Sequence, residues 1–211
     1  MWIRFLSALG QYRVFSTRDV RKLFPDMNLM NLVRWQSKGY IIRIRNGWYC
    51  FNDTESSENI DWLAANLIYA PSSVSLHSAL SYYNLIPEGI YNTTSVSTKK
   101  TNQFTTTLGV FTYHHVKPEL FCFGQTLADV NADMGRGKVS RKIIMASVEK
   151  AILDFFYLYS NYDTEKEIAL LRLNESVVNE ALNDTFYGYL EKFKNKALDK
   201  RISKMKKVCS L

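Results

Sequence analysis

The feature that most constrains this chain is the dipeptide Asn46-Gly47, which separates two short runs rich in strand-forming residues. Residues 41–45 read IIRIR and residues 48–51 read WYCF. An Asn-Gly dipeptide between such runs favours a type I′ turn, because both central residues of that turn need a positive φ. The sequence therefore predicts a two-stranded hairpin over residues 41–51.

Two helical patterns precede this hairpin. Ser16 and Asp19 have the spacing of a capping box, and the apolar residues before Pro25 predict a short helix over residues 17–24. Beyond Pro25, apolar side chains recur at helical spacing as far as Gly39. We expect Leu29, Leu32, Val33 and Gln36 on one side of this second helix and a polar, basic surface on the other.

Helix, turn, polar-faced helix and basic hairpin, in that order, are typical of a winged helix-turn-helix. In that fold the second helix enters the major groove of DNA and the hairpin, or wing, lies along the phosphates. We therefore expect a DNA-binding domain over residues 1–52. The candidates for reading base edges are Asn28, Asn31 and Arg34, because amides and guanidinium groups can form bidentate hydrogen bonds with bases.

The candidates for contacting phosphates are basic residues on the same three elements. They are Arg18, Arg21 and Lys22 in the first helix, Lys38 at the end of the second, and Arg43 and Arg45 in the hairpin. Two other interpretations fit the same residues, a solvated charged surface and a wing that holds a protein partner.

The distribution of charge along the chain supports the DNA interpretation. Residues 1–51 contain nine Lys or Arg against two Asp, a formal charge of +7, and residues 192–211 contain eight against one, again +7. Because the whole chain also carries +7, the residues between these segments carry −7. Clustered positive charge attracts polyanions, so the N-terminal segment is the expected site for nucleic acid. The role of the basic C-terminal tail stays open.

A polar, aperiodic stretch over residues 52–59 predicts a linker, followed by a second domain over residues 60–211. The patterns in this domain indicate a mixed α/β arrangement that ends in helices. Helices are expected at residues 61–70, at 77–84 with Ser75 as cap, from Ser147, and at about 163–173, 174–183 and 184–208. Two antiparallel strands are expected near residues 94–98 and 110–116, joined by a polar hairpin over 99–107. The whole chain is thus assigned to the α+β class.

Several classes of protein are disfavoured by the sequence. No apolar run approaches the roughly 18 to 20 residues that span a bilayer, and Arg4 interrupts the apolar N-terminus, so we expect a cytoplasmic protein without a membrane partner. The isolated cysteines Cys50, Cys122 and Cys209 predict neither a disulfide framework nor a paired metal site. The run from Gly135 to Lys138 lacks the spacing of a phosphate-binding loop.

The histidines do not form an obvious site either. His77 could act as a general base, but a lone histidine at a helix start is more often a packing residue. His114 and His115 would lie on opposite faces of a strand, where they cannot easily share a metal ion. We therefore expect no catalytic residue, no cofactor and no metal site.

The competing class is an enzyme, most plausibly a metal-dependent nuclease. Its acidic and basic groups would come from Asp133, Glu149, Lys150 and Asp154. We place Glu149, Lys150 and Asp154 on or near the edge of the helix that begins at Ser147. Glu149 and Asp154 are five residues apart on that helix, a spacing that separates them around the axis.

Four segments together resemble the AbiEi-like antitoxins. They are residues 74–80 (VSLHSAL) with 85–88 (LIPE), 42–49 (IRIRNGWY), 111–116 (FTYHHV) and 146–154 (ASVEKAILD). The resemblance covers roughly residues 10–160 and implies the antitoxin of a type IV, or abortive-infection, toxin–antitoxin system. Such a protein represses its own operon through a winged helix, and its C-terminal domain counters a nucleotidyltransferase-like toxin. A stand-alone winged-helix regulator without a toxin partner is the alternative.

Overall fold

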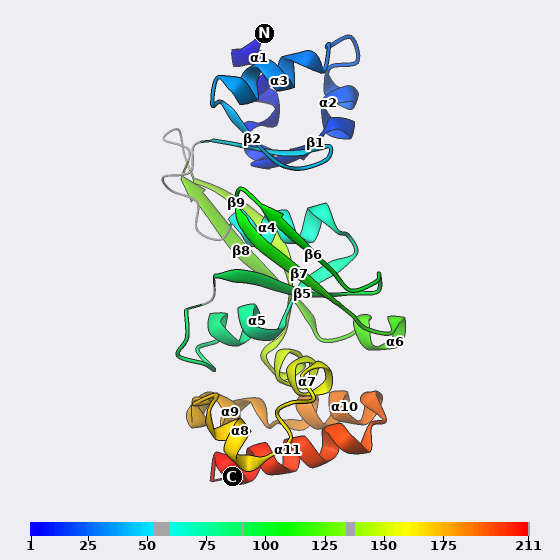
Figure 1. Ribbon diagram of the computed structural model, residues 1–211, viewed down its shortest axis with the longest axis vertical. Helices are drawn as coiled ribbons and strands as arrows, with labels where there is room; N and C mark the ends of the chain where they lie inside the picture. The colour runs from blue at the N-terminus through cyan, green and yellow to red at the C-terminus, as the bar shows by residue number, and fades with distance from the viewer. Residues whose placement is uncertain (53–59, 90, 134–137, 211) are drawn as a thin grey trace.

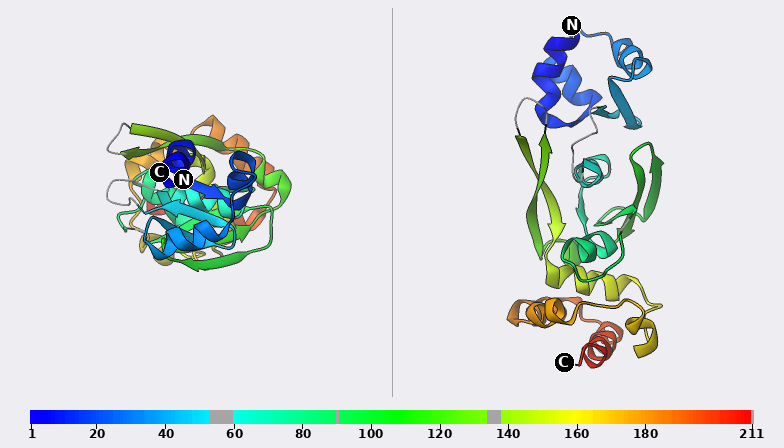
Figure 2. Two further views of the ribbon diagram at one scale, coloured as in Figure 1. Left: turned by 90° about the horizontal axis from the view of Figure 1, so that it is seen from above. Right: turned by 90° about the vertical axis from the view of Figure 1, so that its left-hand side faces the viewer.

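The protein is elongated, with its termini at opposite ends and a β-sheet between them (Figures 1 and 2). The structure is a computed structural model that describes residues 1–52, 60–89, 91–133 and 138–210. Most of the predicted linker, residues 53–59, and most of the Gly135–Lys138 run lie outside the described residues. We call residues 1–52 the N-terminal unit, residues 60–158 the body, and the helices that follow the C-terminal helices.

The N-terminal unit contains helices and a small antiparallel sheet. Its elements are α1 (Trp2–Leu9), the 3-10 helix η1 (Gly10–Tyr12), β1 (Val14–Ser16), α2 (Thr17–Leu23), α3 (Met30–Ser37), β2 (Ile41–Arg45) and β3 (Trp48–Phe51). The capping box is confirmed, because the Ser16 hydroxyl accepts from the Asp19 backbone N–H at 3.2 Å and the Asp19 carboxylate accepts from the Ser16 N–H at 2.8 Å. The sequence analysis did not predict α1 or β1, and β1 adds a strand to the hairpin in the order β1-β3-β2.

The β2–β3 hairpin is confirmed, but the type I′ turn is wrong. Of its two central residues only Gly47 has a positive φ, at +78°. The pairing instead shifts between Arg43 and Arg45, which is a bulge. Bulges bend a strand and re-aim its side chains. Here the side chain between the two arginines, Ile44, is buried against the body.

The small sheet is buried on both faces. One face belongs to an aromatic cluster that includes Phe5, Phe15, Trp35, Tyr49 and Phe51. The opposite face contributes Val14, Ile44 and Cys50 to the core of the body, where α4 supplies Leu63. The N-terminal unit is therefore packed onto the body through apolar side chains.

The described strands of the body form one sheet in the order β6-β7-β5-β4-β9-β8. They are β4 (Ser72–Val74), β5 (Asn92–Ser97), β6 (Asn102–Thr106), β7 (Gly109–His115), β8 (Gln125–Asp133) and β9 (Lys138–Ala146). The predicted antiparallel pairing of β5 with β7 is wrong, because these strands are parallel. The segment expected as their connecting hairpin contains β6, which pairs with the far side of β7.

The long β8–β9 hairpin was not predicted from the sequence. Its backbone pairing runs from Gln125 opposite Ala146 to Asp133 opposite Lys138. Leu127 and Ile144 are exposed while Ala128 and Ile143 are buried. Apolar residues on both sides of these strands hide the alternation that marks a half-buried strand.

Helices cover the sheet and form the far end of the molecule. They are α4 (Ile60–Ile68), α5 (Leu76–Tyr82), α6 (Pro118–Phe121), α7 (Val148–Leu158), α8 (Glu165–Ala169), α9 (Glu175–Ala181), α10 (Asp184–Phe193) and α11 (Lys196–Val208). The single helix expected over residues 184–208 is wrong. The chain turns at Lys194, whose φ is +48°, and the Asn195 side chain then caps α11.

A buried ion pair lies where α5, α7 and α10 meet. Lys150 and Asp154, expected at the edge of α7, are only 2% and 0% exposed and bond to each other. Ser75 donates its hydroxyl proton to Asp154 at 2.9 Å, so its side chain does not cap α5 as predicted. Burial raises the pKa of Asp154, although Lys150 and Ser75 both favour its ionised form. Phe123 and Phe193 place their rings 5.3 Å from the Lys150 ammonium group.

We expect Asp154→Ala to lower the free energy of unfolding by about 3 to 5 kcal/mol, because Lys150 would remain charged and buried without its partner. The double variant Lys150→Met/Asp154→Leu should recover most of this loss, since it removes both charges and keeps apolar volume. Urea denaturation measures the free energy of unfolding of the single and the double variant. The exposed pair of Glu88 and Arg172 provides the control, and Glu88→Ala should cost less than about 1 kcal/mol. Equal losses in the two single variants would contradict this account.

Candidate nucleic-acid interface

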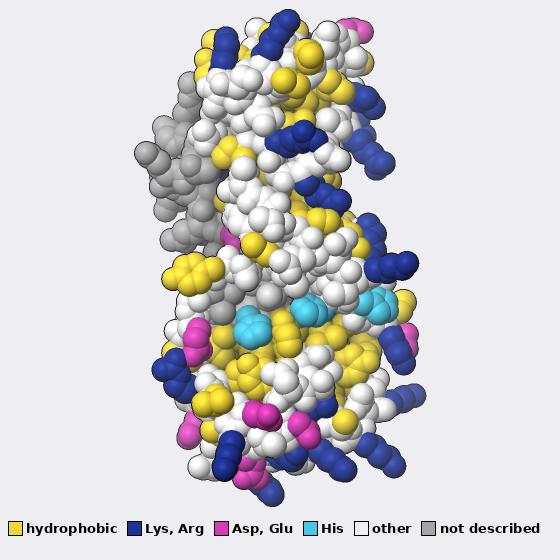
Figure 3. Space-filling model, in the orientation of Figure 1, with side chains coloured by type: hydrophobic (Ala, Val, Ile, Leu, Met, Phe, Trp, Pro, Cys, Tyr) yellow, Lys and Arg dark blue, Asp and Glu magenta, His cyan; other side chains and the backbone are white. Residues whose placement is uncertain are grey.

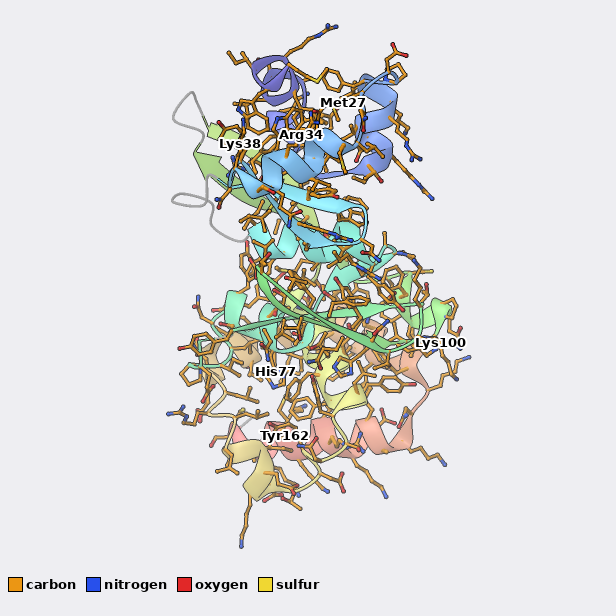
Figure 4. All side chains as sticks on the ribbon, turned by 45° about the horizontal axis from the view of Figure 1, so that its top comes forward. Met27, Arg34, Lys38, His77, Lys100 and Tyr162 are labelled. Atoms are coloured by element: carbon orange, nitrogen blue, oxygen red, sulfur yellow. The ribbon has the colours of Figure 1, made fainter. Side chains whose placement is uncertain are left out.

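The nine residues predicted to contact DNA do not lie on one surface. Lys and Arg side chains lie around the N-terminal unit and again over the lower end of the molecule, whereas Asp and Glu lie mainly over the lower half in the same view (Figure 3). Arg34 lies on α3, Lys38 follows one turn later as its C-cap residue, and both are exposed (Figure 4). Arg21 on α2 is also exposed. These cations form the open part of the predicted interface.

The exposed side of α3 also carries two apolar residues, of which Val33 was predicted to lie on the inner side together with Gln36, and Gln36 is exposed as well. Met30 is 56% exposed and Val33 is 52% exposed, next to Arg34. Leu32 and Trp35 fill the buried side instead. The predicted face was rotated because Trp35, which is amphipathic and large, was not counted among the residues that set the helical period.

The two asparagines make local contacts. The Asn28 side-chain oxygen accepts from the Met30 backbone N–H at 2.8 Å and so supports the start of α3. The Asn31 side-chain nitrogen lies 3.3 Å from the sulfur of Met1. Of the three residues predicted to read bases, Arg34 alone makes no such side-chain contact with the described residues.

The hairpin arginines differ in their surroundings. Arg45 donates to the carbonyl of Ile68 at 3.3 Å, and its guanidinium group lies 3.9 Å from the ring centre of Phe104 on β6. Arg43 is exposed and bonds to Asn46. Its carbonyl accepts from Thr107 in the β6–β7 turn at 3.4 Å. The hairpin is thus held against the body, and Arg45 is one of the side chains that hold it.

Arg18 and Lys22 lie on one side of α2 and line a cleft of about 670 Å³. Arg141 and Lys142 of β9 form the opposite wall. The sequence analysis missed these two body residues because their hairpin was not predicted. The nine predicted residues therefore fall in different places: some lie on an open surface, Arg45 contacts the body, and Arg18 and Lys22 line the cleft.

Those residues of the nuclease hypothesis whose side chains are described do not converge on one site. Lys150 and Asp154 are closed off from solvent in their own ion pair, and Glu149 accepts from Ser147 at 2.7 Å and from Asn183 at 3.1 Å. The side chain of Asp133 lies outside the described part. Within that part of the chain, no group of three or more His, Cys, Asp or Glu residues could hold a metal ion.

His77 and His114 belong to an aromatic cluster around Tyr159. The His77 ring lies 5.0 Å from the ring of Tyr159, and the His114 Nε2 atom lies 3.3 Å from the Tyr159 hydroxyl oxygen. Burial lowers the pKa of both histidines, with their mutual repulsion adding to the effect at His77, and burial raises the pKa of Tyr159 to about 12. His115 points elsewhere, with its Nδ1 atom 3.1 Å from the carbonyl oxygen of Lys99.

No helix in the described ranges is long and apolar enough to cross a membrane. A comparison of the chain with protein-family models and with curated proteins finds no match.

We expect the free energy of unfolding to fall as the pH decreases below the ordinary histidine pKa of 6.5. Because the folded-state pKa values of His77 and His114 are lowered, the unfolded chain takes up protons first, and the stability present above that pH is lost. Urea denaturation from about pH 8 to about pH 5 measures the slope, which His77→Gln/His114→Gln should reduce. His115→Gln is the matched control. A slope unaffected by the double variant would refute the assignment.

Proposed function

We propose that the protein is a DNA-binding transcription regulator whose N-terminal unit acts as a winged helix-turn-helix with α3 as its recognition helix. The observation that carries this proposal is the open side of α3, where Arg34 and Lys38 lie on a short helix that follows the capped helix α2. The order α2, α3, β2, β3 is that of a helix-turn-helix followed by a wing.

The exposed residues of α3 suit a major groove. Arg34 can form a bidentate hydrogen bond with guanine, and Met30 and Val33 can contact the methyl group of thymine. Lys38, together with Arg21 on α2 and Arg43 on the hairpin, is placed to neutralise phosphates. Because the hairpin is held against the body and Arg43 bonds to Asn46, the Arg43 side chain loses less conformational freedom on binding.

We further propose that the protein represses its own operon and counters a nucleotidyltransferase-like toxin. This part rests on the resemblance to the AbiEi-like antitoxins. Two of the segments that carry the resemblance, residues 74–80 and 146–154, meet in the structure, since the first contains Ser75 and the second contains Lys150 and Asp154. Those segments form the core of the body, so they support a shared body fold more than a shared toxin-binding surface.

Two duplexes serve as probes, the DNA upstream of the gene that encodes the protein and a scrambled version of the same sequence. We expect Arg34→Ala to weaken binding to the upstream duplex by about 1 to 3 kcal/mol and to reduce discrimination against the scrambled one. Lys38→Ala and Arg21→Ala should weaken binding to both duplexes and lower the salt slope by about one each. Arg45→Ala should leave the salt slope unchanged, because its guanidinium group contacts the body. Fluorescence anisotropy at two salt concentrations measures all of these values.

Lys200→Ala on α11, an exposed lysine at the opposite end of the molecule, is the control for a nonspecific loss of charge. If Lys200→Ala lowers the salt slope as much as Lys38→Ala, the N-terminal unit is not the DNA-binding surface. Binding that is absent, or equal for the two duplexes, would refute sequence-specific regulation.

We expect co-expression of the protein to restore growth to cells that express the toxin encoded next to it. The Arg34→Ala/Lys38→Ala variant should lose repression of a reporter behind its own promoter but retain this protection, since its body is intact. Growth and reporter activity are measured in the same strain, with toxin expression driven from an unrelated promoter. A harmless neighbouring gene, or a lack of protection, would leave the stand-alone regulator as the better description.

A further inference from the structure

A cleft lies between the N-terminal unit and the body, with α2 on one side and the β8–β9 hairpin on the other. Its walls come from residues far apart in the sequence, Arg18 and Lys22 on one side and Arg141 on the other. Its volume of about 670 Å³ falls within the range of small-molecule sites. The cleft is therefore large enough for a ligand that touches both parts of the chain.

Three cations in this cleft, Arg18, Lys22 and Arg141, form no ion pair with an acid among the described residues. Asp19, the one carboxylate among the lining residues, accepts hydrogen bonds from the Ser16 backbone N–H and hydroxyl and offsets only one of the four positive charges in the lining. Lys142 is paired with Asp129 at 2.6 Å, but Arg18 and Lys22 have no such partner in the described ranges. Like charges gathered around one cavity repel each other unless an anion binds between them. The lining thus favours an anionic ligand.

The Arg141 side chain is already oriented in a way that suits such a ligand. Its guanidinium group lies 4.7 Å from the ring centre of Tyr12 on the opposite wall. A guanidinium group stacked on an aromatic ring keeps its edge free for hydrogen bonding, and its planar fork matches the oxygens of a phosphate. Since the stacking already restricts this side chain, binding would cost less conformational entropy.

Apolar side chains also line the cleft. Trp48 from the hairpin and Leu63 and Leu67 from α4 line it together with the cations. A DNA backbone, which presents phosphates and sugars, would leave this apolar surface without a partner. A ligand with both phosphates and a flat ring fits the two kinds of surface at once.

We infer that this cleft binds a nucleotide. Its phosphates contact Arg18, Lys22 and Arg141, and its base packs against Trp48 and the two leucines. This inference does not depend on the proposed DNA-binding function, because Arg141 belongs to the body and is not part of the surface assigned to DNA.

Isothermal titration calorimetry of the full chain tests the inference with ATP and GTP as probes. Adenosine and guanosine test the base alone, and tripolyphosphate tests the anion alone. We expect at least one nucleotide to bind about tenfold more tightly than its nucleoside or tripolyphosphate, because each partial probe loses one set of contacts. Arg141→Ala and Arg18→Ala should each weaken nucleotide binding by about tenfold or more.

Arg172→Ala is the matched control, since Arg172 is an exposed arginine paired with Glu88 elsewhere on the body. Circular dichroism and urea denaturation establish that each variant is folded. If Arg141→Ala is not, Arg141→Lys replaces it, which retains the charge but loses the fork. The nucleotide-free Arg141→Ala protein should bind upstream DNA like the unmodified chain, so the two proposals can fail separately.

Three results would overturn the inference. The first is no binding of ATP or GTP at millimolar concentration. The second is equal affinity for tripolyphosphate and the nucleotides, which would show an unselective anion site. The third is an equal loss of nucleotide affinity in Arg172→Ala and Arg141→Ala, which would place binding outside this cleft.

Discussion

The buried ion pair between Lys150 and Asp154 constrains how α5, α7 and α10 pack against one another. Two charges removed from water are tolerated only where their partners are close and well placed. Asp154 is held by Ser75 at the junction of β4 and α5, and the Lys150 ammonium group lies near the rings of Phe123 and Phe193. A shift of α5, α7 or α10 would leave one of these groups without its contact. The pair thereby favours one arrangement of these three helices.

A second constraint is the small sheet of the N-terminal unit, which is buried on both faces. Aromatic side chains fix α1, α2 and α3 on one face, and the body covers the other. The β2–β3 hairpin therefore cannot swing freely as a wing. Arg45 also holds the hairpin against the body, through a hydrogen bond to the Ile68 carbonyl and a cation–π contact with Phe104. The same packing that holds the exposed side of α3 in position also forms the cleft lined by Arg18 and Arg141.

The charged side chains of the molecule fall into three separate groups: the exposed cations of α3, the cations of the cleft and the buried ion pair. The open cations of α3 suit a polyanion, whereas the cleft cations, backed by Trp48, suit a small ligand that carries both charge and an apolar ring. The buried pair in α7 takes part in neither. A nuclease built on Asp154 is disfavoured for the same reason, because a carboxylate enclosed by Lys150 and Ser75 cannot reach a substrate.

The sequence by itself determined the local elements whose signals lie within a few residues. The Ser16–Asp19 capping box, the Asn46-Gly47 hairpin and the helix from Ser147 were all predictable from neighbouring side chains. Tertiary structure alone decided the rest, because it depends on residues distant in the chain. The contact between Ser75 and Asp154 spans 79 positions. Strand β6 is positioned by its pairing with β7, and Arg45 contacts the body only because Phe104 of β6 lies beneath its guanidinium group. Periodicity cannot report such pairings, since strand order and the burial of a charge depend on what packs against them.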